Sequence, residues 1–218
     1  RKYLLALLEY RRALKHRNQL LLAARRSGRI NKAHLETWDE ILIENTSTII
    51  WNRRSVVEKL GQRLTQVLRN IITENSDSKI IYQPNILDTS NLREKLTQNI
   101  DTEIRYGKTL SGPHRDEIDF KFSGKSLRQQ GSQGEHKIFL VALKCAEAIF
   151  LEETTAESPI LLLDDVFSEL DEWRAGQLMN QLHGFGQTFI TTPNVKEVPI
   201  HPTRKVNKLQ VHHGSVES

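Results

Sequence analysis

The chain has 218 residues, of which 38% are hydrophobic and 27% are charged, and its formal net charge is +4. This length suits one large domain or two small ones. The single cysteine, Cys145, excludes a disulfide framework and a cysteine-based zinc site, and its apolar neighbours favour a buried structural thiol over a nucleophile. No stretch resembles a membrane span or a signal peptide, so we expect a cytosolic protein. The chain starts at Arg1 inside a helical pattern, and we expect a fragment of a longer protein.

The basic residues are concentrated near the N-terminal end. Residues 1–75 contain 15 Lys and Arg against 7 Asp and Glu, and the first 32 residues contain ten bases and one acid. A segregated positive surface suits a polyanion such as DNA. A solvated helix face that only keeps the chain soluble explains the charge equally well. The candidate nucleic-acid-binding residues are Arg11, Arg12, Lys15, Arg25 and Arg26.

Two long helices are predicted within this basic region. An apolar stripe at helical spacing runs through residues 2–26 and is interrupted by Arg17, and Ser27-Gly28 predicts its end. A second pattern runs from Leu35 to Ile71, and the short connection makes the two helices antiparallel neighbours. At about 1.5 Å per residue the second helix would be roughly 60 Å long and would project as an arm.

The tryptophans of this second helix, Trp38 and Trp51, are expected to pack against the protein rather than to stack on bases. We predict a basic helical arm over residues 1–75 and an α/β domain over residues 76–218.

The remaining elements follow from periodicity and from glycine and proline breaks. We predict strands at 79–86, 117–122, 158–166 and 187–192, helices at 91–107, 134–154 and 172–185, and a final edge strand and turn within 207–218. The exposed pair His212-His213 has no further ligand nearby, so we expect no metal site there.

Two segments resemble the end of a phosphate-binding P-loop. They are Gly107-Lys108-Thr109 and Gly124-Lys125-Ser126, but Thr102 and Asp119 stand where the first glycine of the loop is required. We therefore interpret both segments as glycine turns beside exposed lysines.

A glycine-rich turn, Gly131-Ser132-Gln133-Gly134, directly precedes the most apolar helix. Unpaired N–H groups and the positive end of the helix dipole make such a turn a site for a terminal phosphate. The alternative is that Ser132 is a plain N-cap of its own helix.

A second polar group follows the aliphatic strand ILLL. Asp164 and Asp165 would lie at the carboxyl edge of a sheet, where open α/β sheets bind ligands. The first acid suits Mg²⁺, usually held through water, and the second can deprotonate an attacking water. Alternatively the pair only caps a turn. Asp171 or Ser168 is expected to cap the next helix, and Thr191-Thr192 ends the following strand.

The order of these features resembles the C-terminal half of an ATP-binding-cassette ATPase of the SMC-like kind. The stretches KTLSGPHRDEIDF, GSQGEHKIFLVALKCAEAIFL, PILLLDDVFSELDEWR and QTFITT, together with the two arm helices, resemble the RecF family of bacterial recombination and repair ATPases. The resemblance covers nearly the whole chain. It departs from the family at Gln130, where an aromatic residue is usual, at Glu135-His136, where glutamines are common, and at Pro193-Asn194.

The resemblance implies a fold, cofactors and partners. The fold is the C-terminal half of a P-loop ATPase head with a helical-hairpin lobe, and the P-loop itself lies in a part that this sequence lacks. ATP and Mg²⁺ are sandwiched between two subunits, with Asp164 at the metal and Asp165 at the attacking water. Ser132, Gln133 and Gly134 face the γ-phosphate in trans, with Asp171 and Thr191 also near nucleotide.

The implied activity is an ATPase that binds single- and double-stranded DNA at gaps. The implied partners are RecR and RecO-type mediators and a second copy of the chain, and the implied outcome is RecA loading. The fragment alone should not hydrolyse ATP. The alternatives are the C-terminal half of another SMC-like head and a basic helical scaffold that does not hydrolyse ATP.

Overall fold

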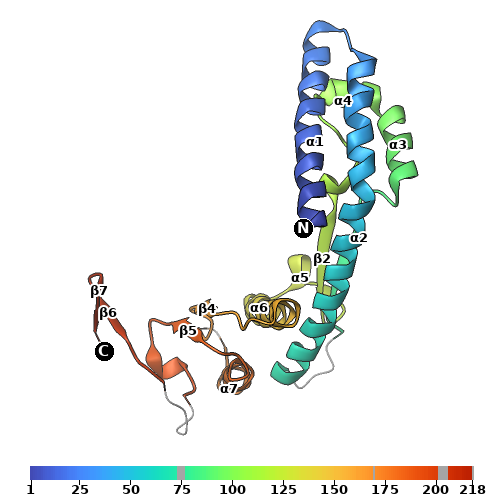
Figure 1. Ribbon diagram of the computed structural model, residues 1–218. Helices are drawn as coiled ribbons and strands as arrows, with labels where there is room; N and C mark the ends of the chain where they lie inside the picture. The colour runs from blue at the N-terminus through green and yellow to red at the C-terminus, as the bar shows by residue number, and fades with distance from the viewer. Residues whose placement is uncertain (73–76, 169, 201–205, 218) are drawn as a thin grey trace. The chain divides into compact units, whose positions relative to one another are not determined.

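The computed structural model describes residues 1–72, 77–168, 170–200 and 206–217, which form two compact units (Figure 1). One unit comprises Arg1–Gly61 and Lys79–Lys121, and the other comprises Gln62–Ser78 and Phe122–Ser218. Each unit therefore takes two separate stretches of the chain. The domain boundary predicted between residues 75 and 76 lies outside the described residues and stays a prediction.

Two antiparallel helices, α1 (Lys2–Ser27) and α2 (Lys32–Ile71), dominate the first unit (Figure 1). The predicted end of α1 is confirmed: Gly28 takes the left-handed conformation at φ 68 and donates its N–H to the carbonyl of Ala24. Alanines on α1 allow the helices to approach closely. The buried cluster between them consists of Ala6, Tyr10, Ala13, Leu42 and Ile49.

The rest of the first unit packs against this hairpin. Its elements are β1 (Lys79–Gln83), α3 (Thr89–Gln98), α4 (Ile100–Tyr106), the short 3₁₀ helix η1 (Pro113–Arg115) and β2 (Glu117–Phe122), with β1 and β2 antiparallel. The prediction of one helix over 91–107 is wrong, because Asn99 leaves helical geometry at φ −93 and ψ 5 and separates α3 from α4. The Asn99 side chain donates instead to Ser111 Oγ at 3.5 Å.

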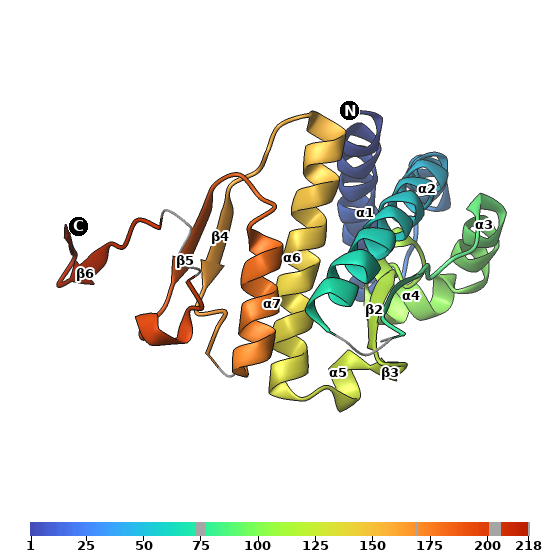
Figure 2. The ribbon, with the colours of Figure 1, turned by 90° about the horizontal axis from the view of Figure 1, so that it is seen from below.

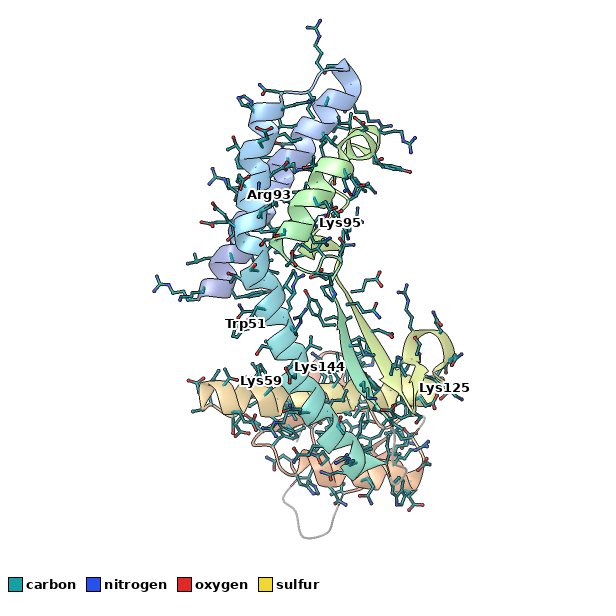
Figure 3. All side chains as sticks on the ribbon, turned by 90° about the vertical axis from the view of Figure 1, so that its right-hand side faces the viewer. Trp51, Lys59, Arg93, Lys95, Lys125 and Lys144 are labelled. Atoms are coloured by element: carbon teal, nitrogen blue, oxygen red, sulfur yellow. The ribbon has the colours of Figure 1, made fainter. Side chains whose placement is uncertain are left out.

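The two tryptophans of α2 differ in their surroundings. Trp38 packs against the α1–α2 cluster and stacks on His16, with ring centroids 4.6 Å apart. Trp51 is 67% exposed and projects from α2 (Figure 3), so the prediction that it packs is wrong. Ile49, two positions earlier, is buried against α1, so Trp51 lies on another face of α2.

The second unit begins with the last turns of α2 and resumes at Phe122. Its further elements are β3 (Lys125–Ser126), α5 (Leu127–Gln130), α6 (Gln133–Thr155), β4 (Leu161–Asp164), α7 (Glu172–Leu182), β5 (Thr188–Thr191), the 3₁₀ helix η2 (Val195–Glu197), β6 (Gln210–His212) and β7 (Ser215–Glu217). The parallel pair β4–β5 lies next to α6 and α7 (Figure 2). Helices with a parallel strand pair confirm the predicted α/β class.

The predicted final strand and turn form a small hairpin, in which Val211 lies opposite Val216 and both side chains are exposed. Cys145 is buried in α6, as predicted, and burial raises the pKa of its thiol to about 12. Among the described residues, no helix has the length and apolarity that a membrane crossing needs.

Candidate functional site

The turn before α6 is exposed, which a phosphate site requires. Ser132 is the N-cap of α6: its hydroxyl accepts from the Glu135 N–H at 3.2 Å, and Glu135 Oε2 accepts from the Ser132 N–H at 2.7 Å. This reciprocal pair is a capping box. It lowers the pKa of Glu135, because the carboxylate accepts the backbone and side-chain hydrogen bonds of Ser132. The capping interpretation of Ser132 is therefore correct.

The two glycines of this turn serve different purposes. A Cβ on Gly131 would lie 2.7 Å from the Leu127 carbonyl oxygen, so the fold itself requires a glycine there. A Cβ on Gly134 would meet nothing within 4 Å. The N–H groups of Gln133 and Gly134 lie in the first helical turn, where no intrahelical acceptor exists. The open space above Gly134 is thus next to unpaired donors, which fits the approach of an anion.

The carboxyl ends of β4 and β5 meet at one edge, as the strand pattern predicts. Asp164 is the register partner of Thr191, and the Thr191 hydroxyl donates to Asp164 Oδ1. Both side chains are exposed. Two candidate residues that are 27 positions apart are therefore in direct contact. Asp164 keeps its second carboxylate oxygen for another ligand.

Asp165 has an unusual backbone conformation. Its φ of 48 is in the left-handed region, which costs about 1 kcal/mol or more for a residue other than glycine. Its N–H donates to the Thr191 carbonyl at 3.0 Å, and its Oδ2 accepts from the Ser168 hydroxyl at 2.8 Å. Its Oδ1 is buried without a hydrogen-bond partner among the described residues. This free acceptor is at the strand edge where the sequence predicts chemistry.

These carboxylates fit a hard cation. Mg²⁺ prefers oxygen ligands and is commonly held by one or two carboxylates together with water and phosphate oxygens. Asp164 and Asp165 each have an oxygen without a protein donor. The described residues contain no group of three or more His, Cys, Asp and Glu side chains that could hold a metal by themselves. The pair suits a cation that arrives with a phosphate ligand.

Asp171 caps the helix α7. It is the N-cap of α7, and its carboxylate accepts from the Arg174 N–H at 2.8 Å and pairs with the Arg174 side chain at 3.3 Å. The prediction that Asp171 or Ser168 caps this helix is confirmed for Asp171. Glu169, which lies between them in the SELD motif, is outside the described residues.

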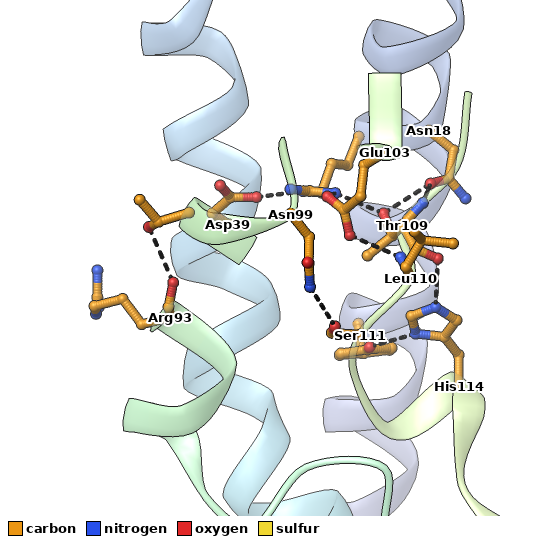
Figure 4. A network of polar contacts seen from close by, with 12 residues as sticks. Asn18, Asp39, Arg93, Asn99, Glu103, Thr109, Leu110, Ser111 and His114 are labelled. Carbon is orange, nitrogen blue, oxygen red and sulfur yellow. Dashed lines mark hydrogen bonds and ion pairs between the residues drawn. The ribbon is translucent and has the colours of Figure 1, made fainter. Parts of the chain in front are cut away.

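The candidate nucleic-acid-binding residues Arg11, Arg12, Lys15, Arg25 and Arg26 are all exposed on α1. Arg17 counts among the bases of the same helix, but its side chain is 0% exposed. It pairs with Asp39, and its Nη1 lies 2.6 Å from Glu103 Oε2 and donates to Thr109 Oγ1 at 2.9 Å (Figure 4). Arg17 therefore joins α1 to α2 and α4 and contributes nothing to the exposed charge.

The two Gly-Lys segments are turns, as predicted. Gly107 ends α4 at φ 67, Gly124 has φ 77, and Lys108 and Lys125 are exposed. Thr109, the last residue of the first segment, is buried and accepts from Arg17.

His114, whose role the sequence leaves open, is a bridging residue of the first unit. Its Nδ1 lies 2.7 Å from the Tyr10 hydroxyl, and its Nε2 lies 3.2 Å from the Thr109 carbonyl oxygen. Because a carbonyl only accepts, Nε2 carries the proton and Nδ1 accepts from Tyr10. Burial lowers the pKa of His114. The neighbouring Arg115 is exposed.

Two further residues, Lys137 and Ser168, contribute to the site. Lys137 Nζ donates to the Ser168 carbonyl oxygen at 2.8 Å and to the Ser168 hydroxyl. It lies 4.0 Å from Asp165 Oδ2. Ser168 appears in the sequence only as a possible cap, and no local pattern connects it to a lysine 31 residues earlier.

Two solved RecF structures are similar to this chain. The chain is similar to the recombination mediator protein RecF–ATP in the RecFOR pathway, with a TM-score of 0.81 and 31% identity over 99% of this chain and 58% of that one. It is also similar to RecF–ATPrS in the same pathway, with a TM-score of 0.78 and 32% identity over the same shares. The fold class is therefore that of the RecF ATPase structures.

Curated RecF sequences are also similar to this chain. The chain is 38% identical over 199 residues to the DNA replication and repair protein RecF of Moorella thermoacetica, which covers 91% of this chain and 53% of that protein. It is 34% identical over 216 residues to the RecF of Geotalea daltonii, covering 95% of this chain and 58% of that protein. No family model matches the chain. The chain thus spans a little over half of these relatives, and the matches in sequence and structure together support a RecF C-terminal part.

Proposed function

We propose that the chain is part of an ATP-dependent DNA-binding protein of recombinational repair and replication. It contributes two halves of a nucleotide site that is completed when two copies meet. The observation that carries this proposal is the exposure, within one unit, of both Ser132 and Gln133 at the start of α6 and Asp164 at the end of β4. Relatives named for DNA replication and repair, and a solved RecF named with ATP, support it.

Each half of the site has its own task. The N–H groups of Gln133 and Gly134 and the Ser132 hydroxyl bind the terminal phosphate of an ATP held by the other copy. Asp164 holds Mg²⁺, which when bound neutralises charge between the β- and γ-phosphates. Asp165 accepts a proton from the attacking water. Thr191 fixes the Asp164 carboxylate, and Asp171 maintains the start of α7.

The apolar faces of the second unit support a longer protein. Parallel strands are normally covered on both faces. Leu162 is 75% exposed and its register partner Phe189 is 47% exposed. We propose that a further part of the protein, which also holds the P-loop, covers this face, and that this chain by itself does not hydrolyse ATP.

The DNA-binding role rests on the exposed bases of α1. Arg11, Arg12 and Lys15 lie within about one helical turn, and Arg25 and Arg26 lie near the helix end. Contacts from such side chains to phosphates hold single- and double-stranded DNA without reading its sequence. Closure of the ATP-bound dimer aligns two such helices on gapped DNA, and RecR and RecO-type mediators then promote RecA loading.

The test uses the full-length gene product that contains this chain. Asp165→Asn removes the proton acceptor, and kcat for ATP hydrolysis should fall by about 10²–10⁴-fold while ATP still binds. Gly134→Ala places a methyl group in open space, so the fold should persist, but ATP-dependent dimerisation measured by analytical ultracentrifugation should be lost.

Gly176→Ala is the matched control, because Gly176 is also helical and its added Cβ also meets nothing within 4 Å. It should leave both hydrolysis and dimerisation unchanged. Unchanged hydrolysis in Asp165→Asn would overturn the assigned role of Asp165. Failure of the unaltered full-length protein to hydrolyse ATP would favour the scaffold interpretation.

A further inference from the structure

A lysine of α6, Lys137, donates hydrogen bonds to the turn that follows β4. Lys137 belongs to the second turn of α6, and its ammonium group donates to both the carbonyl and the hydroxyl oxygen of Ser168. Its side chain is 23% exposed. Both contacts lie within the second unit, and they connect the helix that starts at Ser132 with the turn that carries Asp165.

The direction of these hydrogen bonds determines which carboxylate oxygen of Asp165 accepts a hydrogen bond. An ammonium group has three donors and no acceptor, so Lys137 must donate to the Ser168 hydroxyl oxygen. The hydroxyl proton of Ser168 is then free to point to Asp165 Oδ2, which lies 2.8 Å away. Asp165 Oδ2 is thereby occupied, and Oδ1 remains the unpartnered acceptor. The lysine thus determines, through Ser168, which oxygen of Asp165 is hydrogen-bonded.

The backbone at this turn needs such support. Asp165 is in the left-handed region at φ 48, a conformation that persists only where neighbouring contacts enforce it. The Ser168 hydroxyl also lies 3.2 Å from the Asp165 carbonyl oxygen. Lys137 fixes Ser168 at both its hydroxyl and its carbonyl, and so fixes the whole turn.

We propose that Lys137 is a positioning residue that couples the phosphate-binding turn of α6 to Asp165 through Ser168. This inference rests on the proposed function. Ser132 and Lys137 are five residues apart on one helix, a rise of about 7.5 Å, so a displacement of the helix start is transmitted to the ammonium group. In a dimer, the phosphate bound at Ser132 belongs to one nucleotide and Asp165 acts on the other, so Lys137 links the two nucleotide sites.

The first arm of the test uses this chain without nucleotide. Amide hydrogen exchange of the peptide covering residues 164–168 is compared between the unaltered chain and Lys137→Met. Loss of two hydrogen bonds from a charged donor should accelerate exchange there by roughly tenfold or more. Lys137→Arg should retain protection. Lys144→Met is the matched control, because Lys144 is an exposed lysine of the same helix that pairs with Glu147, at 2.8 Å.

The second arm uses the full-length product. Lys137→Met should lower kcat by about tenfold or more with the KM for ATP unchanged, and Lys137→Arg should restore kcat. Replacing a residue that only stabilises the fold would shift the melting temperature without lowering kcat at an unchanged KM for ATP. Ser168→Ala, which removes the hydroxyl but keeps the carbonyl, should also lower kcat and serves if Lys137→Met folds poorly.

Equal exchange of residues 164–168 in Lys137→Met and Lys144→Met would overturn the coupling. So would an unchanged kcat in both Lys137→Met and Ser168→Ala. These outcomes are separate from failure of the proposed function, which Asp165→Asn tests alone: exchange in the nucleotide-free chain does not depend on hydrolysis.

Discussion

Replacing the buried Arg17 with methionine should strongly destabilise the first unit. The side chains of Arg17 and Glu103 are both 0% exposed, and that of Asp39 is 18% exposed. Methionine keeps much of the apolar volume of the arginine but removes every hydrogen-bond donor. Two carboxylates would then remain buried without their cation.

The magnitude follows from burial. Removing one partner of a buried ion pair costs about 3–5 kcal/mol, because it leaves an uncompensated charge in the interior. That loss is a large fraction of the total stability of a typical domain, about 5–15 kcal/mol. The two hydrogen bonds that Asn18 Oδ1 accepts from Thr109, at 2.7 and 2.8 Å, remain and keep the loss from being larger.

The loss of unfolding free energy in Arg17→Met should also depend on pH. Burial already raises the pKa of Glu103 and of Asp39, and the positive charge of Arg17 opposes that rise. Without Arg17 both pKa values rise further above their unfolded values. A raised carboxyl pKa favours the folded state only at low pH, and that contribution is lost as the pH rises through the folded-state pKa. The variant should therefore lose more stability at pH 7 than at pH 5.

The assay is urea unfolding followed by tryptophan fluorescence in a Trp173→Phe background, so that Trp38 and Trp51 of the first unit give the signal. Arg26→Met, an exposed base of the same helix, is the control and should change the unfolding free energy by less than about 0.5 kcal/mol. The reasoning is refuted if Arg17→Met unfolds within about 1 kcal/mol of the unaltered chain at pH 7, or if its loss is the same at both pH values.

Two further predictions concern His114 and the exposed bases. The lowered pKa of His114 means that the unfolded chain binds its proton more readily, so stability should fall as the pH drops through about 6.5. NMR titration of the ring, which contacts Tyr10 and Thr109 and is also influenced by Arg17, Arg115 and Asp116, checks this; a pKa at or above the unfolded value would contradict it. DNA affinity should fall steeply with salt, and replacing Arg11, Arg12 and Lys15 with glutamine should reduce the log–log slope by about 0.9 for every DNA phosphate that the variant no longer neutralises. Lys125→Gln, an exposed lysine of the other unit, is the control, and a salt-independent affinity would favour a face that only keeps the chain soluble.

Sequence patterns predicted those structural features that depend on residues close together in the chain. The apolar period predicts α1 and α2, Gly28 marks the end of α1, and the aliphatic strand before Asp164 predicts an acid pair at a sheet edge. Capping of α6 by Ser132 is also visible in the sequence, because a cap and its helix are only a few residues apart. These features determine the class of fold and the region of the site.

The partners of the polar side chains were decided by tertiary structure. Arg17 looks like one more base of a basic helix, but the fold places Asp39 and Glu103 around it and buries it. Asp165 looks like a free carboxylate, but the Ser168 hydroxyl, which Lys137 contacts, occupies one of its oxygens. Trp51 is exposed although Ile49 and Ile50, directly before it on α2, are buried. Such contacts join residues tens of positions apart, and no sequence period records them, because they arise only when the chain closes on itself.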